Sequence, residues 1–154
     1  MDEAVRHHPA LGELRWDAAR HSWETDLDLF PGCPIHFAIV AEDEWEDVEP
    51  AELFEIGTAF LAWAREFEPQ CRERVADDLL DLFNQSWADD DPEEGPPTHT
   101  RAEFLAAIRL SDLTLYPGGA SHWYYDPGDL FAGHRIWLMV DADRSFRGKA
   151  SLVG

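Results

Sequence analysis

The segment "SWETDLDLF" at residues 22–30 alternates acidic side chains with mostly apolar ones, at a period of two. One side of this pattern carries Trp23, Thr25, Leu27 and Leu29, and the other carries Glu24, Asp26 and Asp28. Successive side chains of a β-strand point to opposite faces, so the pattern predicts a strand with one buried face and one face in water. Such a strand needs neighbouring strands and a layer that covers its apolar face.

Two more strands are predicted beside this one. Leu14 and Trp16 lie two positions apart in the segment before it, and the run "IHFAIV" at 35–40 repeats the alternation after it. The connections "DAAR" at 17–20 and "PGCP" at 31–34 have the composition of turns. Short connections favour antiparallel neighbours, so the first forty residues predict a three-stranded meander.

The period changes to that of a helix between residues 50 and 87. Apolar side chains recur there at helical spacing, and Pro50 suits a first helical turn. Pro69 interrupts the run, so one kinked helix and two separate helices both fit. Thr100 followed by Glu103 is a capping-box signature and predicts a short third helix over about 101–108.

Strand patterns return after residue 110 in "SDLTLY", "SHWYYD", "HRIWLMVDAD" and "KASLVG". The predicted fold class is therefore α+β: an antiparallel sheet of about seven strands, in the order βββ-ααα-ββββ, with helices packed on one face. We expect a flexible N-terminus at 1–10 and a single domain at 11–154, because a chain of 154 residues is long enough to bury one core.

The charge of the chain is strongly negative. Asp and Glu number 32 against 12 Lys and Arg, a formal net charge of −20, and residues 40–100 carry −16 of it. This charge repels nucleic acid and anionic membranes and attracts basic proteins. General acidity that serves solubility is the alternative explanation. With no signal-peptide pattern and no apolar run of about 20 residues, we expect a cytoplasmic protein that does not enter a membrane. Cys33 and Cys71 are then expected to be reduced, with a disulfide between them as the alternative.

The segment "WYYDPGDLFAGHRIW" at 123–137 gathers polar side chains between two predicted strands. Asp126, Asp129 and His134, with His122 just before them, are of the residue types that bind Zn²⁺ or Mn²⁺. The same letters also describe a tight turn, because Asp126 can cap it, Pro127 fixes φ and Gly128 accepts a positive φ. The spacing contains no helix-borne histidine pair and no phosphate-binding loop.

Three stretches resemble a bacterial family known as domain of unknown function 2262. They are "YYDPGDLFAGHRIWL", the early "LGELRWDAARHSWETDLDL" and the helical segment that ends in "NQSW". The resemblance covers residues 11–154. It implies an α+β fold and no established activity.

The sequence predicts a protein-binding module, in which an acidic surface holds a basic partner as an immunity protein holds its toxin. Trp45 and Trp87 are the predicted aromatic anchors. One alternative is a metal-dependent enzyme or metal-binding site at the 122–134 loop, and another is a DNA mimic built from "EDEWEDVE" and "ADDDPEE". No catalytic residue and no cofactor are predicted, and the oligomeric state is left open. The predicted binding residues are Trp45, Trp87, Asp126, Asp129 and His134.

Overall fold

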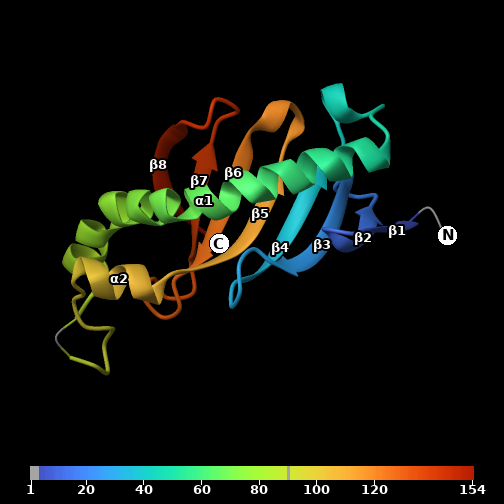
Figure 1. The fold of residues 1–154 in the computed structure, drawn as a ribbon. Helices are drawn as coiled ribbons and strands as arrows, with labels where there is room; N and C mark the ends of the chain where they lie inside the picture. The colour runs from blue at the N-terminus through green and yellow to red at the C-terminus, as the bar shows by residue number, and fades with distance from the viewer. Residues whose placement is uncertain (1–3, 90) are drawn as a thin grey trace.

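A computed structural model describes residues 4–89 and 91–154 and shows one eight-stranded sheet with a long helix across one face (Figure 1). The strands follow one another in the sheet in chain order. They are β1 (Val5–His8), β2 (Gly12–Asp17), β3 (Ser22–Asp28), β4 (Pro34–Val40), β5 (Arg109–Leu115), β6 (Ser121–Asp126), β7 (Arg135–Val140) and β8 (Phe146–Val153). The helices are α1 (Pro50–Leu82) and α2 (Arg101–Ala107).

The α+β class is confirmed, but the prediction of a purely antiparallel sheet is wrong. β4 and β5 run parallel, with His36 opposite Asp112 and Ile39 opposite Leu115. Parallel neighbours need a long crossover, and here α1 and α2 form it by carrying the chain across the sheet before β5 begins. The turns that join the other neighbouring strands are short, and those pairs are antiparallel.

The predicted number of strands is also wrong, because β1 adds an eighth. It lies inside the range 1–10 that was expected to be a flexible terminus, of which residues 1–3 fall outside the described residues. Its sequence "VRHH" shows no alternation of apolar and polar side chains. Backbone pairing with β2 defines the strand, with Val5 opposite Arg15 and His8 opposite Gly12.

α1 is one continuous helix, which settles the question left open at Pro69. Its 33 residues span about 50 Å. The chain then makes a π-helical turn at Phe83–Trp87. Gly57 marks a close approach to the sheet, since a Cβ at this position would lie 2.6 Å from the Cδ1 atom of Ile39.

The short helix predicted over about 101–108 is confirmed as α2, and its start is capped as predicted. Because α1 is continuous, α2 is the second α-helix of the described residues, and the predicted run of three helices is wrong. The Thr100 hydroxyl accepts a hydrogen bond from the Glu103 amide at 3.2 Å, and the Glu103 carboxylate accepts one from the Thr100 amide at 2.8 Å.

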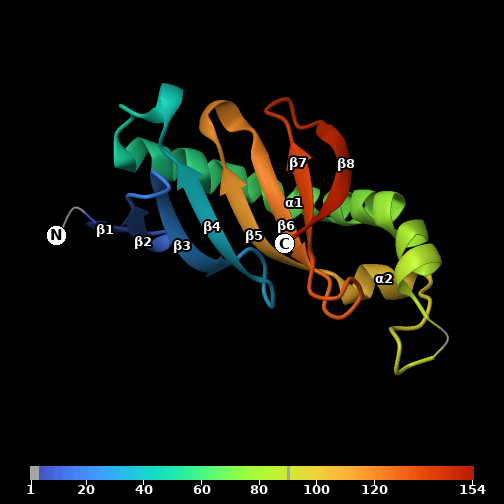
Figure 2. The same cartoon turned by 180° about the vertical axis from the view of Figure 1, so that it is seen from behind.

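The core lies between α1 and the face of the sheet that α1 crosses. Its largest fully buried side chains include Phe37, Trp123 and Tyr125. No helix of the described residues covers the opposite face, where β3 to β7 stand in front of α1 (Figure 2). None of the described helices is both long and apolar enough to cross a membrane. The face opposite α1 and the segments around the ends of α1 are therefore where functional side chains can meet a ligand.

Candidate functional site

Contacts made by its own residues fix the conformation of the 122–134 loop. Asp126 accepts a hydrogen bond from the Gly128 amide at 2.8 Å, which is the predicted turn, and lies 3.6 Å from Arg109. Leu130 and Phe131 are buried in the core. The loop is thus held at both its turn and its apolar centre.

The structure brings only two of the three predicted loop residues together. Asp126 and His134 line a hollow of about 260 Å³ with Asp112 and Arg135, whereas Asp129 does not line it. Over residues 4–89 and 91–154, no three or more His, Cys, Asp or Glu side chains are placed to hold a metal ion. His122 lies elsewhere, on the uncovered sheet face, 4.5 Å from Tyr116 between ring centroids.

The two predicted tryptophan anchors lie at opposite ends of α1. Trp45 precedes the helix and Trp87 follows it, so a helix of about 50 Å separates them. Both are partly buried against the core. The Trp87 ring meets the rings of Phe131 and His134 at 5.5 and 5.8 Å. One compact partner surface is too small to use both tryptophans.

Residues 42–49, which we call the acidic segment, carry six exposed carboxylates. They are Glu42, Asp43, Glu44, Glu46, Asp47 and Glu49. Consecutive turns hold the segment, because the amides of Trp45, Glu46 and Val48 each donate to a carbonyl three residues earlier. Trp45 and Val48 pack inward, so the acids point into solvent. No ion pair within 4.0 Å joins them to a cation of the described residues.

A hollow of about 460 Å³ borders the acidic segment, and we call it the tryptophan hollow. Its walls are mostly apolar: Ala4, Arg6, Trp16, Trp23, Ala41, Glu46, Val48, Pro50 and Leu53. The rings of Trp16 and Trp23 lie 5.3 Å apart, and Phe54 meets Trp23 edge-on at 5.4 Å. An aromatic wall beside exposed carboxylates suits a side chain that is apolar in the middle of a basic stretch.

A third cluster centres on His36, on the uncovered face of the sheet. His36 Nδ1 lies 2.9 Å from Asp26 and Nε2 lies 2.6 Å from Glu24, which also accepts the Ser22 hydroxyl hydrogen bond at 2.7 Å. Each ring nitrogen faces a carboxylate oxygen, so the cluster favours the imidazolium, which donates from both nitrogens. Burial alone lowers the pKa of His36, but the hydrogen bonds and charges of Asp26 and Glu24 outweigh it and raise this pKa above 6.5.

The His36 cluster predicts a distinct pH dependence of stability. Because the pKa of His36 is raised on folding, its stabilisation is fully present below about pH 6.5 and is lost as the pH rises through the folded-state pKa. His36→Gln should remove this part of the dependence of the melting temperature on pH. His122 is the control. Burial and the charge of Arg147 lower its pKa, so its contribution to stability should depend on pH in the opposite direction. A His36 ring signal that titrates at or below pH 6.5 in NMR contradicts the prediction.

Two of these features were not found from the sequence. The tryptophan hollow joins strand residues to residues before α1, and no local pattern links them. The His36 cluster had a signal, since Glu24 and Asp26 fall on the polar face of one predicted strand and His36 on that of the next. The register that sets Asp26 opposite His36 brings them together.

Residues 8–150 match a protein family described as "Uncharacterized protein conserved in bacteria (DUF2262)". The matched range contains the acidic segment, the His36 cluster, both helices and all but Ala4 and Arg6 of the tryptophan hollow. No curated protein and no solved structure matches the chain.

Proposed function

The chain belongs to DUF2262, and we propose that it is a protein-binding module that holds a basic partner on the acidic segment and the tryptophan hollow. In an immunity-like role, the bound partner would be a toxic protein, and binding would cover the surface with which that protein acts.

The exposed carboxylates of the acidic segment, which form no ion pair with the described residues, carry this proposal. Six like charges within eight residues repel one another and destabilise the free chain. The N-terminus of α1 relieves part of this repulsion near Glu49, because its dipole favours negative charge. Lysine and arginine side chains of a partner would relieve the rest and speed association by steering.

The tryptophan hollow supplies what charge alone lacks, a pocket for an anchor. Binding energy in protein interfaces concentrates in a few apolar or aromatic side chains that fill such pockets, while surrounding charges guide the approach. The hollow shares Glu46 and Val48 with the acidic segment, so one short stretch of a partner can reach both.

Several acids of α1 are less suited to this role because they are already paired. Arg101 bridges Glu73 and Asp77 on α1, and His8 contacts Glu55 at 3.0 Å. A DNA mimic needs an extended row of free carboxylates at phosphate-like spacing, and these pairings interrupt such a row along α1. A protein partner at the acidic segment is therefore the better fit.

A defined peptide tests the proposal. A capped pentapeptide with one phenylalanine between two pairs of lysines should bind in calorimetric titration, and the same peptide with glycine at the centre should bind more weakly. The triple variant Glu44→Gln, Glu46→Gln and Asp47→Asn should bind the phenylalanine peptide about tenfold more weakly, since three close charges are lost.

The matched control neutralises three exposed acids of the loop after α1: Asp91→Asn, Glu93→Gln and Glu94→Gln. This variant carries the same net charge and should change the affinity by no more than about twofold, because its charges lie far from the hollow. Equal weakening in the two triple variants would mean that the peptide senses only net charge. Equal binding of the glycine peptide would remove the tryptophan hollow from the proposal.

A further inference from the structure

The uncovered sheet face contains a further hollow, of about 440 Å³, which we call the sheet hollow. Its size lies within the range of small-molecule sites. It opens beside the carboxyl ends of the parallel strands β4 and β5, and Val40, Glu42 and Tyr116 line that end.

The sheet hollow exists because small side chains alternate with large ones on this face. Ala38, Val40 and Thr114 are the small side chains that β4 and β5 contribute to its lining, to which the same strands add His36 and Asp112. Tyr116 and Tyr124 rise beside them. A flat or narrow ligand can therefore rest on the backbone of β4 and β5 with an aromatic ring at its side.

The charges around the sheet hollow are compensated with one exception. Arg135 pairs with Asp112, and the Glu24 carboxylate accepts from His36 and Ser22. Glu42 is the carboxylate of this lining without an ion pair among the described residues.

The two tyrosines are suited to face a cation. Burial, then the neighbouring Tyr124 and the charge of Glu42, raise the pKa of Tyr116. Its hydroxyl oxygen can accept a hydrogen bond from an ammonium group, and its ring face attracts positive charge. The Arg135 guanidinium already lies 4.8 Å from the centre of the Tyr124 ring, which shows this kind of contact within the lining.

We propose that the sheet hollow binds a small organic amine, with the ammonium group between Glu42 and Tyr116 and the apolar body on Ala38 and Val40. This site shares Glu42 with the acidic segment, but it is separate from the tryptophan hollow, which lies on the α1 side of the sheet, and it does not require a protein partner.

Phenethylamine is a suitable probe, with phenethyl alcohol as its neutral counterpart. Titrated into the ¹⁵N-labelled protein, the amine should shift the backbone amide signals of Ala38, Val40 and Thr114, and the alcohol should bind at least about tenfold more weakly. Glu42→Gln should lower the affinity for the amine by about tenfold. Glu44→Gln is the matched control, because it removes the same charge two residues away, outside the lining of the sheet hollow.

A steric variant gives an independent test. Ala38→Leu should fill the sheet hollow and abolish the localised shifts, while Ala62→Leu, on the exposed side of α1, should leave them unchanged. Glu42 and Glu44 are both exposed, so their variants test the charge even if Ala38→Leu fails to fold. Equal loss of affinity in the two glutamate variants, shifts that persist in a folded Ala38→Leu protein, or a response to lysine peptides without one to the free amine would each overturn the proposal.

Discussion

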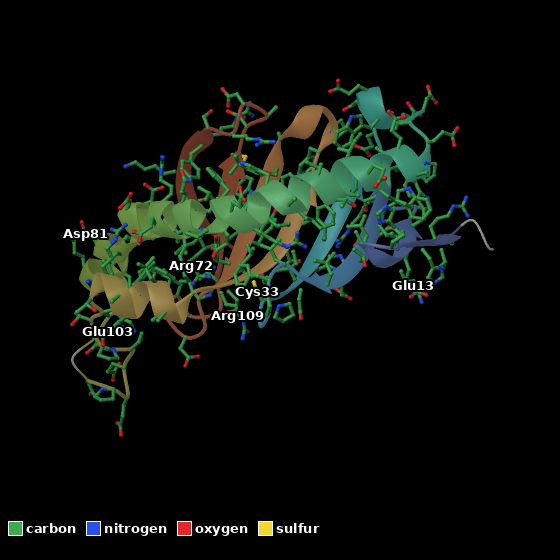
Figure 3. The ribbon with its side chains drawn as sticks, in the orientation of Figure 1. Glu13, Cys33, Arg72, Asp81, Glu103 and Arg109 are labelled. Carbon is green, nitrogen blue, oxygen red and sulfur yellow. The ribbon has the colours of Figure 1, made fainter. Side chains whose placement is uncertain are left out.

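Replacing Arg72 by methionine is expected to lower the free energy of unfolding by about 3–5 kcal/mol, because it leaves a buried carboxylate without its partner. Glu68 is only 3 % exposed, and both of its oxygens lie 3.3 Å from the Arg72 Nε atom. Arg72 Nη1 also donates to the carbonyl oxygens of Leu105 and Ile108, at 2.7 and 2.6 Å. Figure 3 shows Arg72 in the space between α1 and α2.

This network joins four elements of the fold. Glu68 and Arg72 belong to α1, the two carbonyls mark the end of α2 and the start of β5, and Tyr125 of β6 donates its hydroxyl hydrogen bond to Glu68 at 2.7 Å. The network therefore fixes the position of the junction at which the chain leaves α2 and enters β5. Apolar contacts hold α1 on the sheet, and the network fixes where the crossover ends.

Urea unfolding of Arg72→Met measures the effect, with Arg101→Met as the control. Arg101 also pairs with two carboxylates, but on the surface, where solvent screens the charges, so its loss should cost much less than the loss of Arg72. Glu68→Gln combined with Arg72→Met should recover part of the loss, because no buried charge is left unpaired. A double variant as unstable as Arg72→Met alone would assign the cost to the two carbonyls or to packing.

The sequence contained enough information for most strands and for the start of α2. Period-two alternation located β3 and β4, and the Thr100–Glu103 pair located the helix cap, because both signals depend on residues within a few positions of each other. The parallel pairing of β4 with β5 depends on where a crossover of nearly 70 residues returns, which no local pattern records. β1 was not predicted for a related reason. It forms because its backbone pairs with β2, and its own side-chain pattern does not indicate a strand.

The buried charges were hidden for the same physical reason. In the sequence, Glu68 is one of many acids on a helix whose acids are otherwise mostly exposed, and its burial follows from meeting Tyr125, 57 residues later. The acidic segment, in contrast, was visible as "EDEWEDVE", with Trp45 at its centre. Its neighbouring hollow was not visible, because Trp16 and Trp23 reach it from β2 and β3.

The 122–134 loop gives the second large expected effect. Phe131→Ala should lower the free energy of unfolding by about 3–5 kcal/mol, the usual cost of removing a buried aromatic ring. Phe131 is fully buried and meets the rings of Phe83, Trp87 and Phe104 at 5.6, 5.5 and 6.4 Å. It therefore closes the end of the core where α1 ends and α2 begins.

Asp129→Ala, two residues away, is the matched comparison in the same loop. Asp129 is exposed, so its replacement should change the free energy of unfolding by no more than about 0.5 kcal/mol. A metal site in the loop would give a different result: Asp129→Ala and His134→Ala would each abolish a stoichiometric response to Zn²⁺ or Mn²⁺ in calorimetric titration.

The turn at Asp126 and the ring of Phe131 both hold the loop in place. The turn fixes the path of the loop, and the ring fills the core beneath it. We therefore expect urea unfolding to separate Phe131→Ala from Asp129→Ala by several kcal/mol. Similar stabilities for the two variants would mean that the ring of Phe131 does not hold this end of the core.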